Sequence, residues 1–179
     1  QVQGKEQIQR LVTGVTASQA LIDAAINLKA DAILVHHGYF WKGENACVVG
    51  MKKNRLKALL MNDISLLDYH LPLDAHHELG NNVQLAKKLG LGIAEPLYPE
   101  NPKQVGNIAV LDEPMSAEDF SALCERVLSQ KPIHIAGASQ LIKTIGFCTG
   151  AAQGFIEQAV VMGCDAYLSG EISEPTVHT

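Results

Sequence analysis

The amino-acid sequence predicts an α/β protein of two lobes, with largely parallel or mixed sheets flanked by helices. Strand and helix patterns alternate along the 179 residues, which is typical of parallel strands joined by crossover helices. Several strand patterns are short, uninterrupted apolar runs, as expected for strands covered on both faces. The 47% apolar content is enough to bury a substantial core, and the length allows one large domain or two small ones.

Residues 1–97 are assigned to a first lobe in which three strands alternate with three helices. We expect the strands at 11–15, 32–35 and 64–69, and the helices at 19–28, 51–61 and 82–89. Ser18 is the expected N-cap of the first helix, and Gly90 ends the third. In the second helix the periodicity places Leu56, Leu59 and Leu60 inward, and Lys52, Lys53 and Lys57 outward.

The proline-rich stretch 96–102 predicts a boundary, after which residues 98–164 form a second lobe. Residues 165–179 begin a further segment, and both ends of the chain look cut. We expect a smaller sheet here, parallel or mixed, with strands at 107–111, 133–136, 142–147 and 165–169. A helix capped by Ser116 runs through Leu128 with Asp119 at its third position, a second covers 156–162, and a third starts at 177–179.

Composition disfavours several classes of protein. The net charge of −5 supplies no basic surplus for phosphates, so a general nucleic-acid-binding role is disfavoured. The four cysteines form no Cys-x-x-Cys pair, which argues against a zinc ribbon or a disulfide framework and favours reduced thiols in a cytoplasm. No apolar stretch approaches the roughly 20 residues of a membrane span, and the first residues lack a signal-peptide pattern. The sequence therefore predicts a cytoplasmic protein without a membrane partner.

Two strand patterns end in side chains that can bind metals. His36, His37 and Gly38 close the apolar run 32–35, and the sequence His-Leu-Pro-Leu-Asp at 70–74 follows the next strand. Imidazole and carboxylate together suit a divalent ion such as zinc, iron, manganese or nickel, and sites of this kind collect at the carboxyl ends of parallel strands. The sequence therefore predicts a metal site formed by His36, His37 and Asp74.

Adjacent histidines on one strand leave two arrangements open. Neighbouring side chains of a strand point to opposite faces, so His36 and His37 could hold one ion only if the strand has ended and the chain turns at Gly38. Alternatively each binds its own ion, and Asp74 bridges the two ions or caps one of them. The plain alternative is a hydrogen-bonded pair at a strand end.

Pro72 disfavours a helix between His70 and Asp74, so we expect an extended or looping segment there. Asp74 is the better ligand candidate, while His70 would orient it or face a substrate. A capping role for Asp74 near Leu79 is the structural alternative. His76 and His77, beside Glu78, receive no functional role.

Two later motifs give weaker signals. The segment 148–154 joins a strand to a helix, where backbone amides can hold an anion, but it lacks the spacing of a phosphate loop and a tight turn is favoured. Glu171 and His178 are seven residues apart and would share one helix face, either lining a cleft or sitting on a solvated helix start.

Taken together, the segments 13–16, 32–41, 51–56 and 70–82 resemble the Nif-three-like family, whose members carry the name GTP cyclohydrolase 1 type 2. The resemblance is close to the bacterial members and covers nearly the whole chain. The His-His pair combined with His-Leu-Pro-Leu-Asp-Ala-His is specific, and the turn at Gly150 and the segment 170–173 agree in order and character.

The resemblance implies a two-lobed subunit of a homohexameric ring, a toroid, with a dinuclear centre of two divalent metal ions in each subunit. The first three family ligands fall on His36, His37 and Asp74. The other family ligands, a His and a Glu, belong to a motif beyond Thr179. The family also folds its carboxyl-terminal segment back onto the first lobe, which makes residues 98–164 an inserted lobe.

Function can then be expected in three forms. The first is a metal-dependent hydrolase of GTP cyclohydrolase 1 type 2 kind, in which the metals activate water against a small, nucleotide-like substrate and His70 is the catalytic proton shuttle. The second is a ring-forming metal-binding scaffold or interaction protein. The third, nucleic-acid handling through the ring, would need a positive inner surface, and the only dense basic run, 52–57, is equally explained as a solvated helix face.

Overall fold

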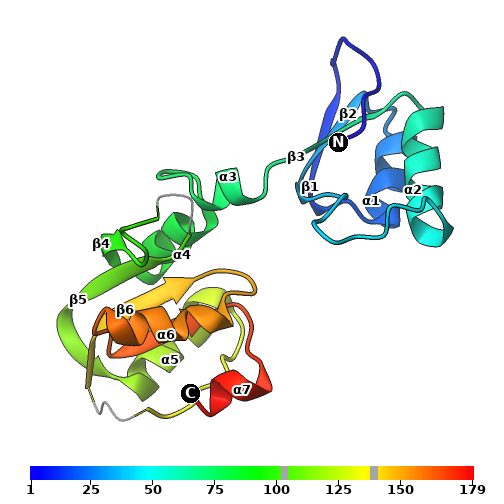
Figure 1. Cartoon of the computed structure of the whole chain (residues 1–179). Coiled ribbons are helices and arrows are strands. Elements are labelled where there is room, and N and C mark those ends of the chain that lie inside the picture. Colours follow the sequence, from blue (N-terminus) through cyan, green and yellow to red (C-terminus); the bar gives the residue numbers. More distant parts are fainter. Residues whose placement is uncertain (102–104, 138–140) are drawn as a thin grey trace. The chain divides into compact units, whose positions relative to one another are not determined.

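The computed structural model describes residues 1–101, 105–137 and 141–179. The chain forms two compact units, Gln1–Pro72 and Leu73–Thr179, and each is described by itself. Both are α/β, so the predicted class and the two-lobed organisation are confirmed (Figure 1). The predicted lobe boundaries at residues 97 and 164 stay a prediction, and Pro102, part of the expected boundary stretch, lies outside the described residues.

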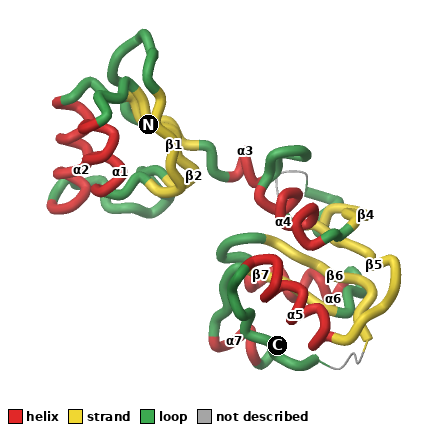
Figure 2. The backbone as a smooth tube through the Cα atoms, turned by 180° about the vertical axis from the view of Figure 1, so that it is seen from behind, coloured by secondary structure: helices red, strands yellow, loops and turns green. Residues whose placement is uncertain are grey.

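The first unit is a three-stranded parallel sheet with two helices. Strands β1 (Leu11–Thr16), β2 (Ala32–His37) and β3 (Ser65–Asp68) stand in that order, so β2 is central. Helices α1 (Gln19–Asn27) and α2 (Gly50–Met61) connect them and lie side by side (Figure 2). Apolar side chains of the sheet and both helices form the core, among them Ile22, Ala25, Ile33, Leu59 and Leu66.

The expected helix α1 is confirmed, with Ser18 accepting a hydrogen bond from the Leu21 amide through its side chain. Helix α2 also forms where expected, and Leu56 and Leu59 are buried as predicted. Leu60, however, is 59% exposed, because only one face of α2 packs into the core and Leu60 lies outside that face. Lys53 and Lys57 are exposed as predicted, whereas the Lys52 side chain is only 15% exposed and its ammonium group pairs with Glu44 at 3.2 Å.

The second unit contains a four-stranded mixed sheet. Strands β4 (Gly92–Pro96), β5 (Asn107–Ser116) and β6 (Leu141–Cys148) pair antiparallel, and β7 (Ala166–Ser169) adds to β6 in parallel. The helices are α3 (Leu71–Asp74), α4 (Asn81–Leu89), α5 (Ala117–Leu128), α6 (Ile156–Val161) and α7 (Glu174–Val177), with a 3-10 turn, η1, at Gln153–Phe155. The mixed pairing was expected, but this sheet has one strand more than the first, so the prediction of a smaller sheet is wrong.

Two further predictions for this part of the chain need correction. Residues 133–136 form no strand, and Ile133 is 79% exposed, because an alternating apolar pattern makes a strand only where a neighbouring strand pairs with it. Leu71–Asp74 is a helical turn despite Pro72. Proline is tolerated in the first turn of a helix, where its missing N–H would have no partner. The expected cap at Ser116 is confirmed, since its Oγ accepts from the Asp119 amide at 3.0 Å.

Every helix in the described ranges is too short or too polar to cross a membrane.

A buried carboxylate holds the amino-terminal segment against the first sheet. Asp31, just before β2, accepts from Lys5 Nζ at 2.6 Å and from the amides of Gln9 and Arg10 at 3.1 and 2.9 Å. The Lys5 ammonium, followed by the two amides, lowers the pKa of Asp31 to about 2. The ionised form of Asp31 therefore stabilises the folded state.

We expect Asp31→Asn to destabilise the protein, with a midpoint of thermal unfolding several degrees lower at neutral pH. Because the folded pKa lies below the unfolded value of about 3.9, the stabilisation is fully present above that value and is lost as the pH falls toward 2. The unfolding midpoints of the two proteins should therefore approach each other below about pH 4 and nearly coincide at about pH 2. Asp23→Asn, at an exposed position of α1, is the matched control and should leave the midpoint unchanged; a constant difference down to pH 2 would contradict this assignment.

Candidate metal centre

The parallel pairing of the first sheet brings three histidines to one edge. His36 and His37 are the last two residues of β2, and His70 follows β3 by two residues. Val35 is paired with Asp68, so the carboxyl ends of β2 and β3 stop side by side. Metal-binding and catalytic side chains commonly gather at this end of parallel strands.

The three imidazoles form one compact cluster. The ring centroids of His36 and His37 are 4.6 Å apart, and those of His70 lie 4.9 and 5.3 Å from them. One potential ligand atom of each histidine lies within 4.8 Å of the others. Because a zinc–nitrogen bond is about 2.0–2.1 Å long, small side-chain rotations would bring these atoms around one ion. All three side chains are half-buried, so an ion there would keep access to water.

The rings of His36 and His37 therefore meet, although the two residues are neighbours on one strand. His36 and His37 lie within β2, yet their rings come together because the strand ends at His37 and the chain departs at Gly38. A Cβ at Gly38 would stand 2.1 Å from Gln1 Oε1 and 3.0 Å from the Asp68 Cβ, so a side chain here would displace the Gln1 side chain from its hydrogen bonds to the Tyr39 backbone.

Backbone and hydroxyl groups orient two of the rings. His36 Nδ1 lies 3.0 Å from the Tyr69 carbonyl, to which it donates, and this places the ring's lone pair on Nε2. His37 Nδ1 is 3.2 Å from Thr16 Oγ1, the residue paired with it across β1 and β2. Such contacts to the second ring nitrogen are the usual support of a metal-ligating histidine.

Asp74, the predicted carboxylate ligand, belongs to the second unit, and its role as a ligand stays a prediction. Its Oδ1 accepts from Asn81 Nδ2 at 2.8 Å, so α4 orients the carboxylate. His70, expected as a proton shuttle, joins the histidine cluster instead of standing apart from it. The sequence did not identify His70 as a ligand candidate, because no spacing rule links a residue after β3 to one at the end of β2.

An aromatic loop follows the histidines and was not singled out from the sequence. The ring centroid of Trp41 lies 5.0 Å from that of His70 and 6.3 Å from that of His37. Two residues of the basic run contact this loop: Lys52 Nζ lies 5.0 Å from the centre of the Phe40 ring, and Arg55 Cζ lies 6.0 Å from that of Tyr39. The available signal was the aromatic triplet at 39–41 in a chain with only 5% aromatic residues.

The acidic member of this loop is held ionised. Partial burial opposes the charge of Glu44, but the Lys52 ammonium and the amides of Trp41 and Phe40 outweigh it and lower the pKa of the carboxyl. Lys52 and Arg55 thus contact the loop beside the histidines, while Lys53 and Lys57 are exposed, so only part of the basic run is a solvated face.

The turn at Gly150 is structural, as favoured. The Asn82 side chain, fully buried, accepts from the Thr149 amide at 2.7 Å and donates to Cys148 Sγ at 3.7 Å. Gly150 has a φ of 76°, and a Cβ at Gly170 would stand 2.7 Å from its nitrogen. The two loops after β6 and β7 therefore pack backbone to backbone.

The remaining candidates do not form a site in the described residues. Helix α7 begins after Glu171, so the expectation that Glu171 and His178 share a helix face is wrong; His178 instead lies 3.4 Å from Glu174. His76 accepts through Nδ1 from the amides of Glu78 and Leu79, and its ring stacks on that of His77. These contacts are structural.

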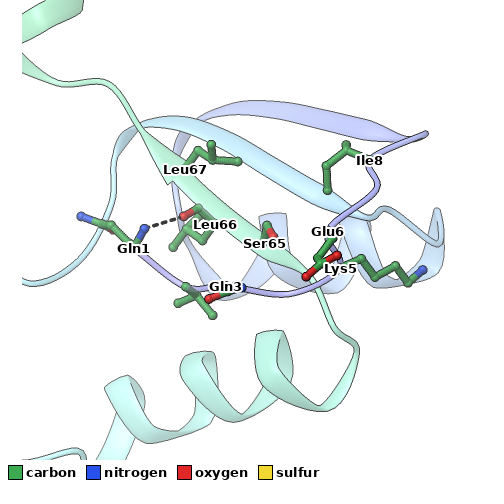
Figure 3. A pocket seen from close by; sticks show the side chains of 9 residues that line it. Gln1, Gln3, Lys5, Glu6, Ile8, Ser65, Leu66 and Leu67 are labelled. Atoms are coloured by element: carbon green, nitrogen blue, oxygen red, sulfur yellow. Dashed lines mark hydrogen bonds between the residues drawn. The ribbon is translucent and has the colours of Figure 1, made fainter.

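An open hollow of about 450 Å³ lies along β3 (Figure 3). It is lined by the segment before β1 and by Ser65, Leu66 and Leu67. Val2 makes an isolated antiparallel bridge to Leu66 there. None of the cluster histidines lines this hollow.

Comparison with known proteins gives matches over the whole chain. The sequence model of the family described as Duf34/NIF3 (NGG1p interacting factor 3) matches residues 1–179. Over 179 residues the chain is 58% identical to a GTP cyclohydrolase 1 type 2 homolog of Pseudomonas aeruginosa, covering 100% of this chain and 71% of that protein. A protein of the same name from Escherichia coli K12 is 49% identical over 183 residues, with the same coverage.

Solved structures agree in fold. The protein ybgI, described as a structural genomics protein of unknown function, superposes with a TM-score of 0.91 at 47% identity, over 99% of this chain and 70% of that one. Reduced HcgD from Methanocaldococcus jannaschii gives a TM-score of 0.82 at 24% identity, over 99% and 71% of the two chains, a likeness of fold alone.

We expect His36→Ala, His37→Ala and His70→Ala each to reduce bound divalent metal at least tenfold, because each removes one donor of a compact set. Elemental mass spectrometry of the purified full-length protein measures this directly. His77→Ala, an exposed histidine outside the cluster, is the matched control and should retain the wild-type content. Full metal content in His70→Ala would show that this histidine is not a ligand.

We expect Thr16→Val to weaken metal binding by about tenfold, without unfolding the protein, because it removes the hydroxyl that orients His37 and keeps the β-branched shape. Competition with a chromophoric chelator gives the dissociation constant. An unchanged constant would mean that the Thr16 contact does not support a ligand.

Proposed function

The chain belongs to the Duf34/NIF3 family, and on that basis we propose that it is a metal-dependent hydrolase acting on a nucleotide-like small molecule. The observation that carries the proposal is the cluster of His36, His37 and His70 at the carboxyl ends of β2 and β3. The name shared by its relatives, GTP cyclohydrolase 1 type 2 homolog, supports a nucleotide as the substrate class.

The donor set fits a divalent metal. Three imidazoles, one with its tautomer fixed by a backbone carbonyl, suit zinc, iron, manganese or nickel. A divalent ion held there would lower the pKa of a bound water and polarise the bond under attack. We propose two such ions in each subunit, with Asp74, oriented by Asn81, as the carboxylate ligand.

His70 has two roles in this proposal. Its ring belongs to the same cluster as His36 and His37, so it can complete a ligand set. An imidazole at the half-buried edge of the cluster can also carry a proton between the reacting group and solvent. The His70→Ala variant separates these roles, since a shuttle is needed for turnover but not for metal retention.

We further propose that the protein acts in the cytoplasm as a homohexameric ring, and that residues 98–164 form an inserted lobe of each subunit. These points are what the resemblance to the family implies, and the match of the family model to residues 1–179 supports them.

The second candidate is a ring-forming metal-binding scaffold or interaction protein. The observation that favours it is the family description itself, NGG1p interacting factor 3, which names an interaction and no reaction. In this alternative the histidine cluster stabilises the subunit, and the metals have no substrate.

The test is hydrolysis of GTP and other nucleotides by metal-loaded, full-length protein, followed by separation of the products. We expect turnover that falls at least a hundredfold in His36→Ala and Asp74→Asn while the oligomer persists in size-exclusion chromatography. His77→Ala should keep full turnover. No hydrolysis of any nucleotide by a protein that holds its metals would overturn the hydrolase and leave the scaffold.

A further inference from the structure

We propose that Trp41 is a stacking platform that holds a flat heteroaromatic ring, of the size of a nucleobase, beside the histidine cluster. The proposal deepens the proposed function and rests on it for the nature of the ring. Trp41 received no role from the metal-ligand chemistry or from the sequence motifs.

Trp41 lies beside the histidine cluster. Its ring stands at 88° to that of His70, with the centroids 5.0 Å apart, so one ring presents its edge to the other. The His37 ring is 6.3 Å away. A molecule that reaches the imidazoles therefore passes within contact distance of the indole.

The side chains of Trp41 and Phe40 also remain in contact with water. Trp41 is 46% exposed and its neighbour Phe40 is 51% exposed. Large aromatic side chains contribute most to stability when they are buried, so a pair of them left half in water beside polar groups is typical of a binding surface. Trp41 is also the only tryptophan of this sequence.

Polar contacts fix the loop around Trp41 without burying it. The Trp41 amide donates to Glu44 Oε2 at 3.1 Å, and the Trp41 carbonyl accepts from the Glu44 amide at 2.9 Å. Lys52, from α2, reaches Glu44 Oε1 at 3.2 Å and the Asn45 carbonyl at 3.1 Å. We call these contacts the Glu44–Lys52 clasp; they hold Trp41 in place before any ligand arrives.

The backbone conformation of Phe40 also supports a binding role for this loop. Phe40 has a φ of 63°, in the left-handed region that side chains with a Cβ seldom adopt. The ammonium of Lys52 lies over the Phe40 ring at 5.0 Å and stabilises it there. A loop held in an unfavourable conformation by three separate contacts is typical of a functional site.

The chemistry of the indole selects the class of ligand. Aromatic side chains stack on nucleobases with little dependence on their sequence, because every base has a π face. Lys52 is engaged by Glu44 and Arg55 lies against Tyr39, so the indole of Trp41 is the part of the loop suited to the ring of a nucleotide. Ring recognition by Trp41 would present the ring's polar edge to the histidines.

The experiment measures binding separately from turnover. Isothermal titration calorimetry of metal-loaded, full-length protein uses guanosine as the probe, with ribose 5-phosphate as the ligand lacking a base. We expect guanosine to bind, Trp41→Leu to weaken it about 5- to 150-fold, and Trp41→Phe to keep most of the affinity. Leu60→Ala, at another exposed apolar residue of the same unit, is the matched control and should bind as the wild type does.

A second variant tests the clasp. Glu44→Gln keeps the indole but removes the charge that pairs with Lys52 and so loosens the hold on Trp41; we expect guanosine affinity to fall severalfold with no change in metal content. Quenching of the fluorescence of wild-type Trp41 by guanosine, but not by ribose 5-phosphate, checks the contact between the indole and a base in a protein whose fold is intact.

The outcomes separate the two proposals. Guanosine binding that depends on Trp41, without any hydrolysis, would support the platform and overturn the hydrolase. Hydrolysis that is unaffected by Trp41→Leu, or guanosine binding that is absent or equal in the wild type and Trp41→Leu, would overturn the platform and leave the hydrolase standing.

Discussion

The parallel pairing of β2 with its two neighbours is the constraint on which the candidate site depends. Because β1, β2 and β3 all run in the same direction, Thr16, His37 and the segment after Asp68 reach the same edge of the sheet. One ladder thus brings together a hydroxyl that orients His37, a carbonyl that orients His36 and a third imidazole. A shift of β3 by one residue would move His70 and Tyr69 away together.

The apolar core keeps this ladder in register. Ile33 and Leu66 are fully buried under α1 and α2, and Asp31 holds the segment before β1 against the start of β2. The histidine cluster is left half-exposed at the opposite end of the strand from Asp31. The carboxyl ends of parallel strands are where loops can carry polar and aromatic side chains.

The loop 40–47 shows a different way of fixing side chains beside the histidine cluster. It contains no helix or strand, and its rigidity comes from Glu44, which is ionised by Lys52 and by two amides of the loop. A carboxylate that accepts hydrogen bonds from the backbone amides of its own loop fixes the conformation of that loop. In the second unit Asn82 has the same role for the turn after β6, since its buried amide group bonds the Thr149 nitrogen.

The sequence by itself determined the α/β class, most strands and helices, and the two residues His36 and His37 at a strand end, because hydrophobic periodicity and capping act over short distances along the chain. It could not determine that residues 133–136 lack a pairing strand, that Leu60 lies outside the helix contact, or that Pro72 lies within the helical turn Leu71–Asp74. Tertiary structure alone decided that His70 joins the first two histidines and that Trp41 stands against them, because these contacts depend on strand order and on a loop conformation fixed by Glu44 and Lys52. Those contacts join residues about 30 positions apart, beyond the reach of any local pattern.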